Sequence, residues 1–127
     1  MAVEQIVKAT EEYWPFILKL RTDLKEGFIK QGPISVHEHY DYMMRHSSCY
    51  WVQLLDDTPV GFVGVIDGDI RYAVDRAYQG RGYGTKLLKW VHNEHPYAEG
   101  LIKAENVSSI KAFENAGFKK KFVIMQR

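Results

Sequence analysis

The feature that most constrains the fold is a glycine-rich junction at residues 79–84, Gln-Gly-Arg-Gly-Tyr-Gly, which joins two different patterns of apolar residues. Before the junction, apolar residues alternate over residues 69–74, which is the period of a β-strand. After it, they follow helical spacing over residues 84–95, and Pro96 ends that helix. The alternating residues are Ile70, Tyr72 and Val74, and the helical ones are Leu87, Leu88 and Val91. A strand must therefore turn tightly into an amphipathic helix here.

The N-terminal third of the chain predicts two helices. The first begins near Tyr13, because Pro15 fits the first turn of a helix better than its interior. The second follows a capping box, in which Ser35 is the N-cap and Glu38 is the third helical residue. This second helix is expected to end at about His46.

The middle of the chain predicts an antiparallel meander. Residues 49–55 and 60–66 are rich in aromatic and β-branched side chains, and a turn-like segment separates them. Asp67-Gly68 is a strong hairpin signal that leads into the strand at residues 69–74. A weaker alternation at residues 3–9 predicts a first strand.

The last third of the chain predicts two further strands and a helix. Residues 100–104 suit a short strand, Ser108 caps a helix that Gly117 closes, and residues 118–125 suit a final strand. The expected fold is α+β with a mixed sheet: an antiparallel meander followed by strand, helix, strand, helix and strand.

Length and composition indicate one domain over residues 1–127. The chain has 127 residues, of which 46% are hydrophobic and 26% charged, which is typical of a globular protein. Seventeen basic and sixteen acidic residues give a net charge of +1, so no bulk field favours nucleic acid or anionic lipid. No apolar run approaches the roughly 18 residues of a membrane span. We expect a soluble, cytoplasmic protein with neither a nucleic-acid nor a membrane partner.

Cysteine and histidine do not predict a metal site. Cys49 is the single cysteine, which excludes an internal disulfide and a site of several thiolates, and we expect it to be a small buried residue. His92 and His95 are three residues apart on the predicted helix, but no third ligand accompanies them. His37 and His39 form the other close pair. We expect no bound metal.

The junction itself predicts an anion site. Glycines let successive N–H groups point outward, and the following helix adds unpaired N–H groups and the positive end of its dipole. Arg81 and Lys86 add formal charge. The spacing of the glycines fits neither a Walker A loop nor a dinucleotide-binding loop. A loop that only turns the chain is the alternative interpretation.

Two motifs resemble the GNAT superfamily of acetyl-CoA-dependent N-acetyltransferases. Residues 79–84 are similar to its Gln/Arg-x-x-Gly-x-Gly/Ala signature, and the strand at 69–74 precedes them as in that family. Residues 106–118 resemble its second motif, an asparagine followed by a helix that ends in Gly-Phe. The N-terminal half fits the family's helices and meander with weaker signatures.

The resemblance implies a binding site for acetyl-CoA between two parallel strands that diverge, here residues 69–74 and 100–104. The pantetheine arm would pair with backbone groups around Ala73 and Val74. Asn106 would contact the pantetheine, and Phe113 would lie near the thioester. The pyrophosphate would rest on the backbone N–H groups of Gln79, Gly80, Arg81, Gly82, Tyr83, Gly84 and Thr85.

The implied reaction transfers an acetyl group from a thioester to an amine. A base must accept the proton of the ammonium group, whose pKa is about 10.4, and a backbone N–H near Val74 would stabilise the oxyanion. Many relatives carry a tyrosine as general acid where this chain has Phe113, which donates no proton. The thiolate then leaves unassisted, or Tyr78, Ser108 or Ser109 reaches it.

The predicted catalytic base is Asp69, which opens the strand at a position where many relatives carry an acidic residue. Alternation places its side chain with Arg71, opposite Tyr72, so it would face the acceptor. Glu105 is the second candidate, and Leu101 occupies a position where some relatives carry their base. A solvated hairpin aspartate is the alternative interpretation of Asp69.

The expected function is therefore acetyl transfer to a primary amine of a small acceptor, such as an amino sugar, with acetyl-CoA as co-substrate. A catalytically silent acyl-CoA-binding domain is the alternative. Phe28 and His39 stand out in the region expected to contact the acceptor. Only nine residues follow Phe118, so we expect a sheet one strand short, with an edge free for a second copy of the chain.

Overall fold

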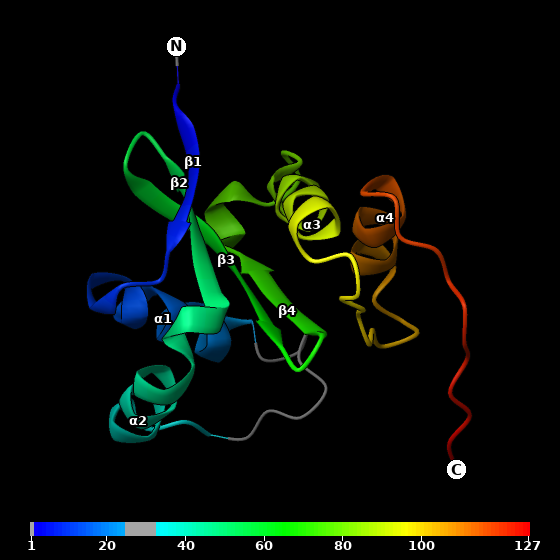
Figure 1. Cartoon of the computed structure of the whole chain (residues 1–127), viewed down its shortest axis with the longest axis horizontal. Coiled ribbons are helices and arrows are strands. Elements are labelled where there is room, and N and C mark those ends of the chain that lie inside the picture. The colour runs from blue at the N-terminus through cyan, green and yellow to red at the C-terminus, as the bar shows by residue number, and fades with distance from the viewer. Residues whose placement is uncertain (1, 25–32) are drawn as a thin grey trace.

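A four-stranded sheet with the order β1-β2-β3-β4 is the centre of the computed structural model, which describes residues 2–24 and 33–127 (Figure 1). The strands are β1 (Glu4–Lys8), β2 (Tyr50–Leu55), β3 (Thr58–Ile66) and β4 (Asp69–Val74). Each strand pairs antiparallel with its neighbour in the sheet. The predicted meander and the weaker first strand are confirmed. Cys49 precedes β2 and is half-buried.

Two-residue turns connect β2 to β3 and β3 to β4. Asp56 and Asp57 have φ angles of 48° and 65°, and Asp67 and Gly68 have φ angles of 51° and 81°. Two successive positive φ angles are what a type I′ turn requires, and aspartate and glycine tolerate them better than other residues do. The hairpin predicted at Asp67-Gly68 is confirmed.

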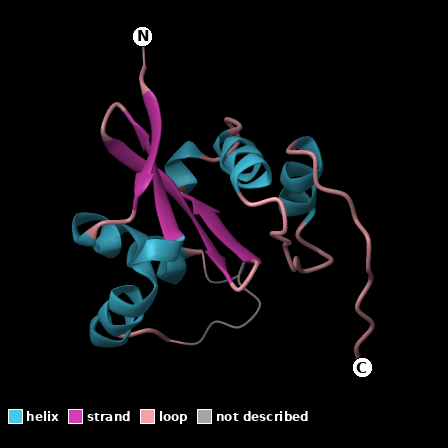
Figure 2. Ribbon diagram, in the orientation of Figure 1, coloured by secondary structure: helices cyan, strands magenta, loops and turns pink. Residues whose placement is uncertain are grey.

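Four α-helices cover the two faces of the sheet. Figure 2 shows α1 and α2 on one side and α3 and α4 on the other. Pro15 lies in the first turn of α1, and the Ser35 side chain accepts the Glu38 N–H at 3.0 Å, as predicted. The helices are α1 (Trp14–Asp23), α2 (Val36–His46), α3 (Tyr83–Glu94) and α4 (Val107–Asn115), with short 3-10 turns at Glu11–Tyr13, Ser47–Cys49 and Arg76–Tyr78.

The alternation along the strands divides the apolar residues into two cores. The α1–α2 core contains Ile17, Leu20, Met43, Tyr50, Phe62 and Ala73 among others. The α3–α4 core contains Val63, Ile70, Val74, Leu87, Leu88, Val91 and Phe113 among others. Because β4 contributes residues to both cores, its backbone lies at the boundary between the two helical layers.

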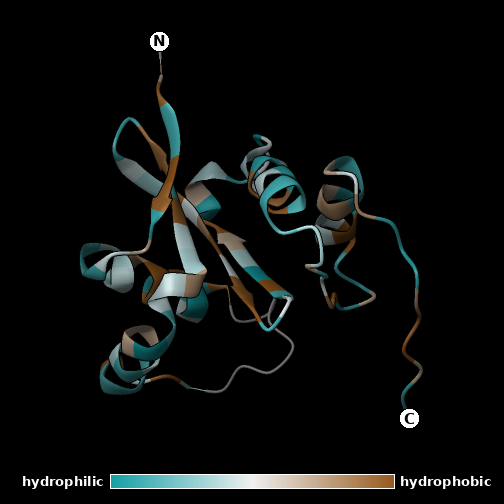
Figure 3. Cartoon of the chain, in the orientation of Figure 1, coloured by the Kyte–Doolittle hydropathy of each residue, from teal (hydrophilic) through white to brown (hydrophobic). Residues whose placement is uncertain are grey.

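Two predicted strands are absent from the described residues, at 100–104 and 118–125. A strand requires backbone pairing with a neighbour, and residues 100–104 diverge from β4 after a single parallel bridge between Asp69 and Glu99. Beyond Phe118 the chain leaves the body of the molecule, and Figure 3 shows an apolar stretch in this tail. Its side chains at Phe122, Val123, Ile124 and Met125 are 60–86% exposed.

The N-cap of α4 is Asn106, and the prediction of Ser108 is therefore wrong. The Asn106 side chain accepts the backbone N–H of Ser109 at 3.2 Å, whereas Ser108 lies inside the first turn and donates its own hydroxyl to Asn106. Both residue types favour N-caps, so composition alone did not distinguish them. In the part of the chain that the structure describes, no helix has the length and apolarity needed to cross a membrane.

Candidate active site

The candidate site is an opening between β4 and the segment that follows α3. The Ile70 N–H donates to the Glu99 carbonyl at 2.9 Å, and the Glu99 N–H donates to the Gly68 carbonyl at 2.8 Å. This bridge closes one end. Beyond it the two segments separate, and a cavity of about 1220 Å³ lies between β4, the start of α3 and α4.

The outer edge of β4 offers backbone hydrogen-bonding groups to this cavity. Because the Ile70 N–H points to this edge, the alternation of a strand directs the backbone groups of Tyr72 and Val74 to the same edge. Those of Arg71 and Ala73 face β3. The Val74 carbonyl accepts the Gln79 side chain at 3.0 Å. The Tyr72 amide and carbonyl and the Val74 amide therefore point toward the opening.

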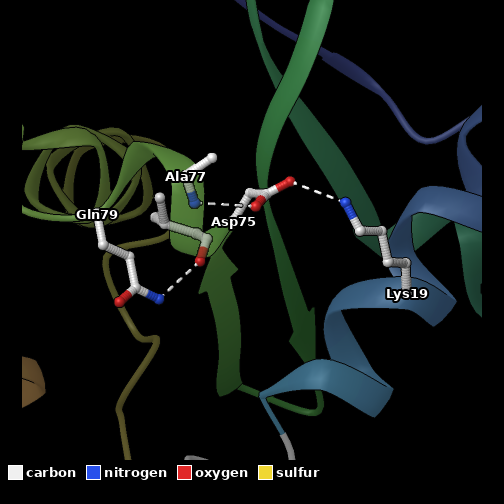
Figure 4. A network of polar contacts seen from close by, with 5 residues as sticks. Lys19, Asp75, Ala77 and Gln79 are labelled. Atoms are coloured by element: carbon white, nitrogen blue, oxygen red, sulfur yellow. Dashed lines mark hydrogen bonds and ion pairs between the residues drawn. The ribbon is translucent and has the colours of Figure 1, made fainter.

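A polar network fixes the loop between β4 and α3 (Figure 4). One carboxylate oxygen of Asp75 accepts the Ala77 N–H at 3.1 Å, and the other pairs with Lys19 of α1 at 3.3 Å. Gln79 binds back to the end of β4 through the Val74 carbonyl. These contacts tie the loop to both the strand and α1 before it reaches the glycines.

Gly80 and Gly82 turn the chain into α3 with φ angles of 79° and 86°. A Cβ at either position would meet no heavy atom within 4 Å, so the space beside these glycines is open. Gly82 is the N-cap of α3 and brings no side chain to the first N–H groups of the helix. The result is an uncapped helix N-terminus facing open space, which favours an anion such as a phosphate.

The two basic side chains of the junction have partners of their own. Lys86 forms an ion pair with Glu4 of β1 at 2.7 Å, and the Arg81 guanidinium lies over the Tyr78 ring at 5.5 Å. The Lys86 charge is therefore paired with Glu4, whereas Arg81 keeps its positive charge and adds to the backbone N–H groups at the start of α3. Gly84 allows α3 to approach β4, because a Cβ there would lie 3.3 Å from the Tyr72 ring.

The opposite wall is formed by Asn106 and α4. Phe113 is buried, and its ring packs on the backbone of Gly100, where a Cβ would lie only 2.4 Å from it. The ring also contacts Tyr72 edge-on, with centroids 5.7 Å apart. Tyr72 and Ser109 join the two walls through their hydroxyl groups at 2.5 Å. The sequence pattern grouped Tyr72 with the apolar residues Ile70 and Val74 and did not predict a site role for it. Its hydroxyl group was the signal that it also needed a polar partner.

The acidic candidates lie on different walls. Asp69 stands at the closed end of the cavity, half-exposed, 3.5 Å from the Nε of Arg71. Glu105 is exposed and lines the other side. Arg71 also donates to the Tyr42 hydroxyl at 3.1 Å, and Tyr42 in turn contacts the Tyr50 hydroxyl at 2.7 Å. Burial raises the pKa of Tyr50, so its hydroxyl group stays protonated at neutral pH.

The structure brings nearly all of the predicted site residues to one cavity. Arg81 is the exception and lies outside the lining. His39 lies apart, buried between α1 and α2, and Phe28 lies outside the described residues. The predicted site residues that line the cavity are Asp69, Ala73, Val74, Gln79, Gly80, Gly82, Tyr83, Gly84, Thr85, Glu105, Asn106 and Phe113. The described residues contain no group of three or more His, Cys, Asp or Glu side chains that could hold a metal ion.

Solved structures, two of them of N-acetyltransferases, have the same fold. The chain matches spermidine N-acetyltransferase from Vibrio cholerae, in complex with CoA and spermine, with a TM-score of 0.80 and 14% identity over 94% of this chain and 82% of that chain. It matches aminoglycoside N-acetyltransferase AAC(6')-Iy in complex with CoA with a TM-score of 0.73 and 16% identity, over 100% and 95% of the two chains. A domain from Methanocaldococcus jannaschii has a TM-score of 0.76 and 27% identity, over 95% and 91%.

Sequence comparison identifies the family. No curated protein matches the chain. The family model described as "Acetyltransferase (GNAT) family" matches residues 9–118, which include every element from the first helix to the end of α4. The chain therefore belongs to the GNAT family of acetyl-CoA-dependent N-acetyltransferases.

Proposed function

We propose that this chain transfers the acetyl group of acetyl-CoA to a primary amine of a small acceptor. The observation that carries the proposal is the alignment of an uncapped helix N-terminus with an open strand edge in one cavity. A pyrophosphate needs the helix N-terminus, and the pantetheine arm joined to it needs the strand edge. The fold of the CoA-bound neighbours supports the same arrangement.

In the proposed complex, the pyrophosphate binds the N–H groups of residues 79–85. The pantetheine pairs with the outer edge of β4, like an added strand. The amide and carbonyl of Tyr72 are free on that edge, so Tyr72 replaces Ala73 as the backbone partner of the pantetheine. The Val74 carbonyl is taken by Gln79, and the Val74 amide is left for the oxygen of the thioester. Asn106 and Phe113 line the other side of the arm.

The chemistry begins with removal of a proton from the acceptor ammonium. Asp69 is the proposed base, acting through water because a carboxylate is a weak direct base for an alkylammonium group. The amine nitrogen then attacks the thioester carbon, and the Val74 N–H stabilises the oxyanion. Glu105 is the second candidate for the base.

The acceptor approaches from the face of β4 that carries Asp69 and Arg71, since the opposite face is filled by the α3–α4 core. An amino sugar remains the predicted acceptor class. The neighbours are named for spermidine and aminoglycosides, which are polyvalent amines, so all three classes belong in one panel of acceptors.

The deciding experiment is release of CoA thiol from acetyl-CoA in the presence of that panel. Amine-dependent thiol release supports the proposal, and binding of acetyl-CoA without release from any acceptor supports the silent domain instead. Asp69→Asn is expected to lower kcat by about 10²–10⁴-fold with little change in acetyl-CoA affinity. The difference in kcat between the variant and the wild type should become smaller at high pH, because the acceptor amine is then already deprotonated by the solvent. Glu105→Gln is the matched variant, and an Asp69→Asn enzyme with full kcat transfers the role to Glu105 or to solvent.

Assembly and location remain predictions. The exposed apolar tail at residues 122–125 and the partly unpaired edge of β4 are consistent with a homodimer that pairs these segments. Sedimentation analysis over a range of concentrations tests it, with Ile124→Asp expected to weaken the dimer and Lys120→Asp as the control. A chain that stays monomeric throughout contradicts it. Cell fractionation tests the cytoplasmic location.

A further inference from the structure

The leaving group of the proposed reaction needs a proton, and Phe113 has none to give. A thiolate with a pKa of about 8.5 leaves less readily than a neutral thiol at neutral pH. Two of the alternative donors have other contacts. The Ser108 hydroxyl donates to Asn106 at 3.2 Å, and the Tyr78 ring packs against Tyr83 and Arg81 at the far end of the site.

Tyr72 and Ser109 occupy the space beside the Phe113 ring. Their hydroxyl oxygens are 2.5 Å apart, and they come from opposite walls, β4 and α4. The Tyr72 ring stands edge-on to Phe113, with centroids 5.7 Å apart. Both Tyr72 and Ser109 line the cavity, so a ligand in the opening can reach the pair.

The position of Tyr72 along β4 brings its side chain close to the reacting atoms. Its backbone faces the same open edge as that of Val74, where the proposal places the pantetheine and the thioester. Gly84 permits α3 to lie against the ring, because a Cβ would come within 3.3 Å of it. The ring is therefore held between α3 and α4 with its hydroxyl directed to Ser109.

We propose that Tyr72 is the general acid that protonates the departing CoA sulfur, and that Ser109 is a positioning residue that holds its hydroxyl. This inference rests on the proposed function. As the C–S bond of the tetrahedral intermediate breaks, its electron pair goes to sulfur, and sulfur takes the Oη proton. Ser109 donates a hydrogen bond to the phenolate oxygen, and a proton from water restores the phenol. The acceptor amine releases its proton through Asp69 to water, and this proton balances the one that water returns to Tyr72.

The protonation state of Tyr72 suits this role. Burial raises the pKa of Tyr72 above its usual value of 10, while the hydrogen bond from Ser109 acts in the opposite direction. The phenol is thus present at neutral pH, and Ser109 eases the loss of its proton.

Tyr72→Phe removes the proton and keeps the ring. We expect kcat to fall roughly 10²-fold, the lower end of general acid catalysis because a thiolate is a fair leaving group, while acetyl-CoA affinity is retained. Ser109→Ala should cause a smaller loss. Phe113→Tyr, introduced into Tyr72→Phe, should restore part of kcat by returning a hydroxyl to the same space. A purely structural role for the Tyr72 hydroxyl predicts no such rescue.

A second measurement does not depend on turnover. The thiol of CoA bound to the protein is titrated by the ultraviolet absorbance of its thiolate, with the S-methyl thioether of CoA in place of CoA as the blank. A donor at Tyr72 stabilises the bound thiolate, so Tyr72→Phe and Ser109→Ala should each raise the thiol pKa. If the wild-type chain shows amine-dependent turnover and Tyr72→Phe has the same kcat and the same thiol pKa as the wild type, this inference is overturned and the proposed function is not. Failure of the wild-type chain to bind CoA overturns the proposed function as well.

Discussion

Gly82 illustrates how one backbone conformation serves both the fold and the proposed cofactor site. Its φ of 86° is disfavoured for residues with a Cβ, and the space beside it is empty of protein atoms. Gly82→Val should therefore leave the chain folded but strained by about 1–2 kcal/mol. The side chain would occupy the space of the pyrophosphate, and acetyl-CoA affinity should fall by about 1.5–3 kcal/mol, as expected for lost hydrogen bonds to a charged group. Calorimetric titration measures the change.

Gly68→Val is the matched control for that prediction, because Gly68 has a similar φ of 81° in the β3–β4 turn, away from the start of α3. It should strain the backbone with a much smaller effect on affinity. Arg81→Ala should also have a small effect, which shrinks further in high salt, since Arg81 lies over Tyr78 outside the cavity lining. Wild-type affinity in Gly82→Val contradicts the placement of the pyrophosphate.

At the same scale, the sequence was sufficient to predict the glycine loop but not the role of Tyr72. Alternation correctly placed Tyr72 with Ile70 and Val74 on one face of β4. That pattern predicts which face of the sheet a residue lies on, but it does not predict the hydrogen-bond partner of the hydroxyl group. The partner, Ser109, is 37 positions away and reaches Tyr72 only when α4 packs on the sheet.

At the scale of elements, α4 depends on its N-cap. The Asn106 side chain satisfies the Ser109 N–H at 3.2 Å and also accepts the Ser108 hydroxyl. Asn106→Ala should lower the free energy of unfolding by about 1 kcal/mol, because that N–H loses its partner in the first turn. Ser108→Ala, which removes the residue predicted as the cap, should change it by only a few tenths of that amount. Urea denaturation of both variants checks the order, and the reverse order contradicts the cap assignment.

Helices and hairpins of this chain were predictable because their signals are local. A capping box, a proline in the first turn and a two-residue turn each act within a few positions. The strands expected at 100–104 and 118–125 failed because pairing is not local. The chain meets β4 at the one bridge between Asp69 and Glu99, after which residues 100–104 diverge from the strand and make room for the cavity. The tail has no strand beside it among the described residues. The missing pairing is thus part of what opens the site.

At the scale of the whole molecule, the sheet separates two layers with different tasks. The α3–α4 layer carries the proposed cofactor site, and the α1–α2 layer packs against the opposite face of β4, which carries Asp69 and Arg71. His39 connects α1 to α2 and is fully buried. Its Nε2–H donates to the Trp14 carbonyl at 2.8 Å, and its Nδ1 accepts from Arg21 at 3.1 Å. Because arginine only donates, this pairing requires the neutral imidazole.

The stability of the whole chain should therefore depend on pH through His39. Burial lowers the pKa of His39 below its usual value of 6.5, and the charge of Arg21 acts in the same direction, against the hydrogen bond to Trp14. Below pH 6.5 the unfolded chain binds a proton that the folded chain resists, so the free energy of unfolding should fall as pH decreases, by at most about 1.4 kcal/mol per pH unit. His39→Gln keeps a polar side chain but does not titrate, so its stability should fall less steeply over the same range. Urea denaturation from pH 7.5 down to about pH 5 measures both slopes, and His37→Gln, an exposed change on the same helix, controls for loss of a histidine as such. Equal slopes in wild type and His39→Gln would show that His39 accepts its proton in the folded chain as readily as in the unfolded one.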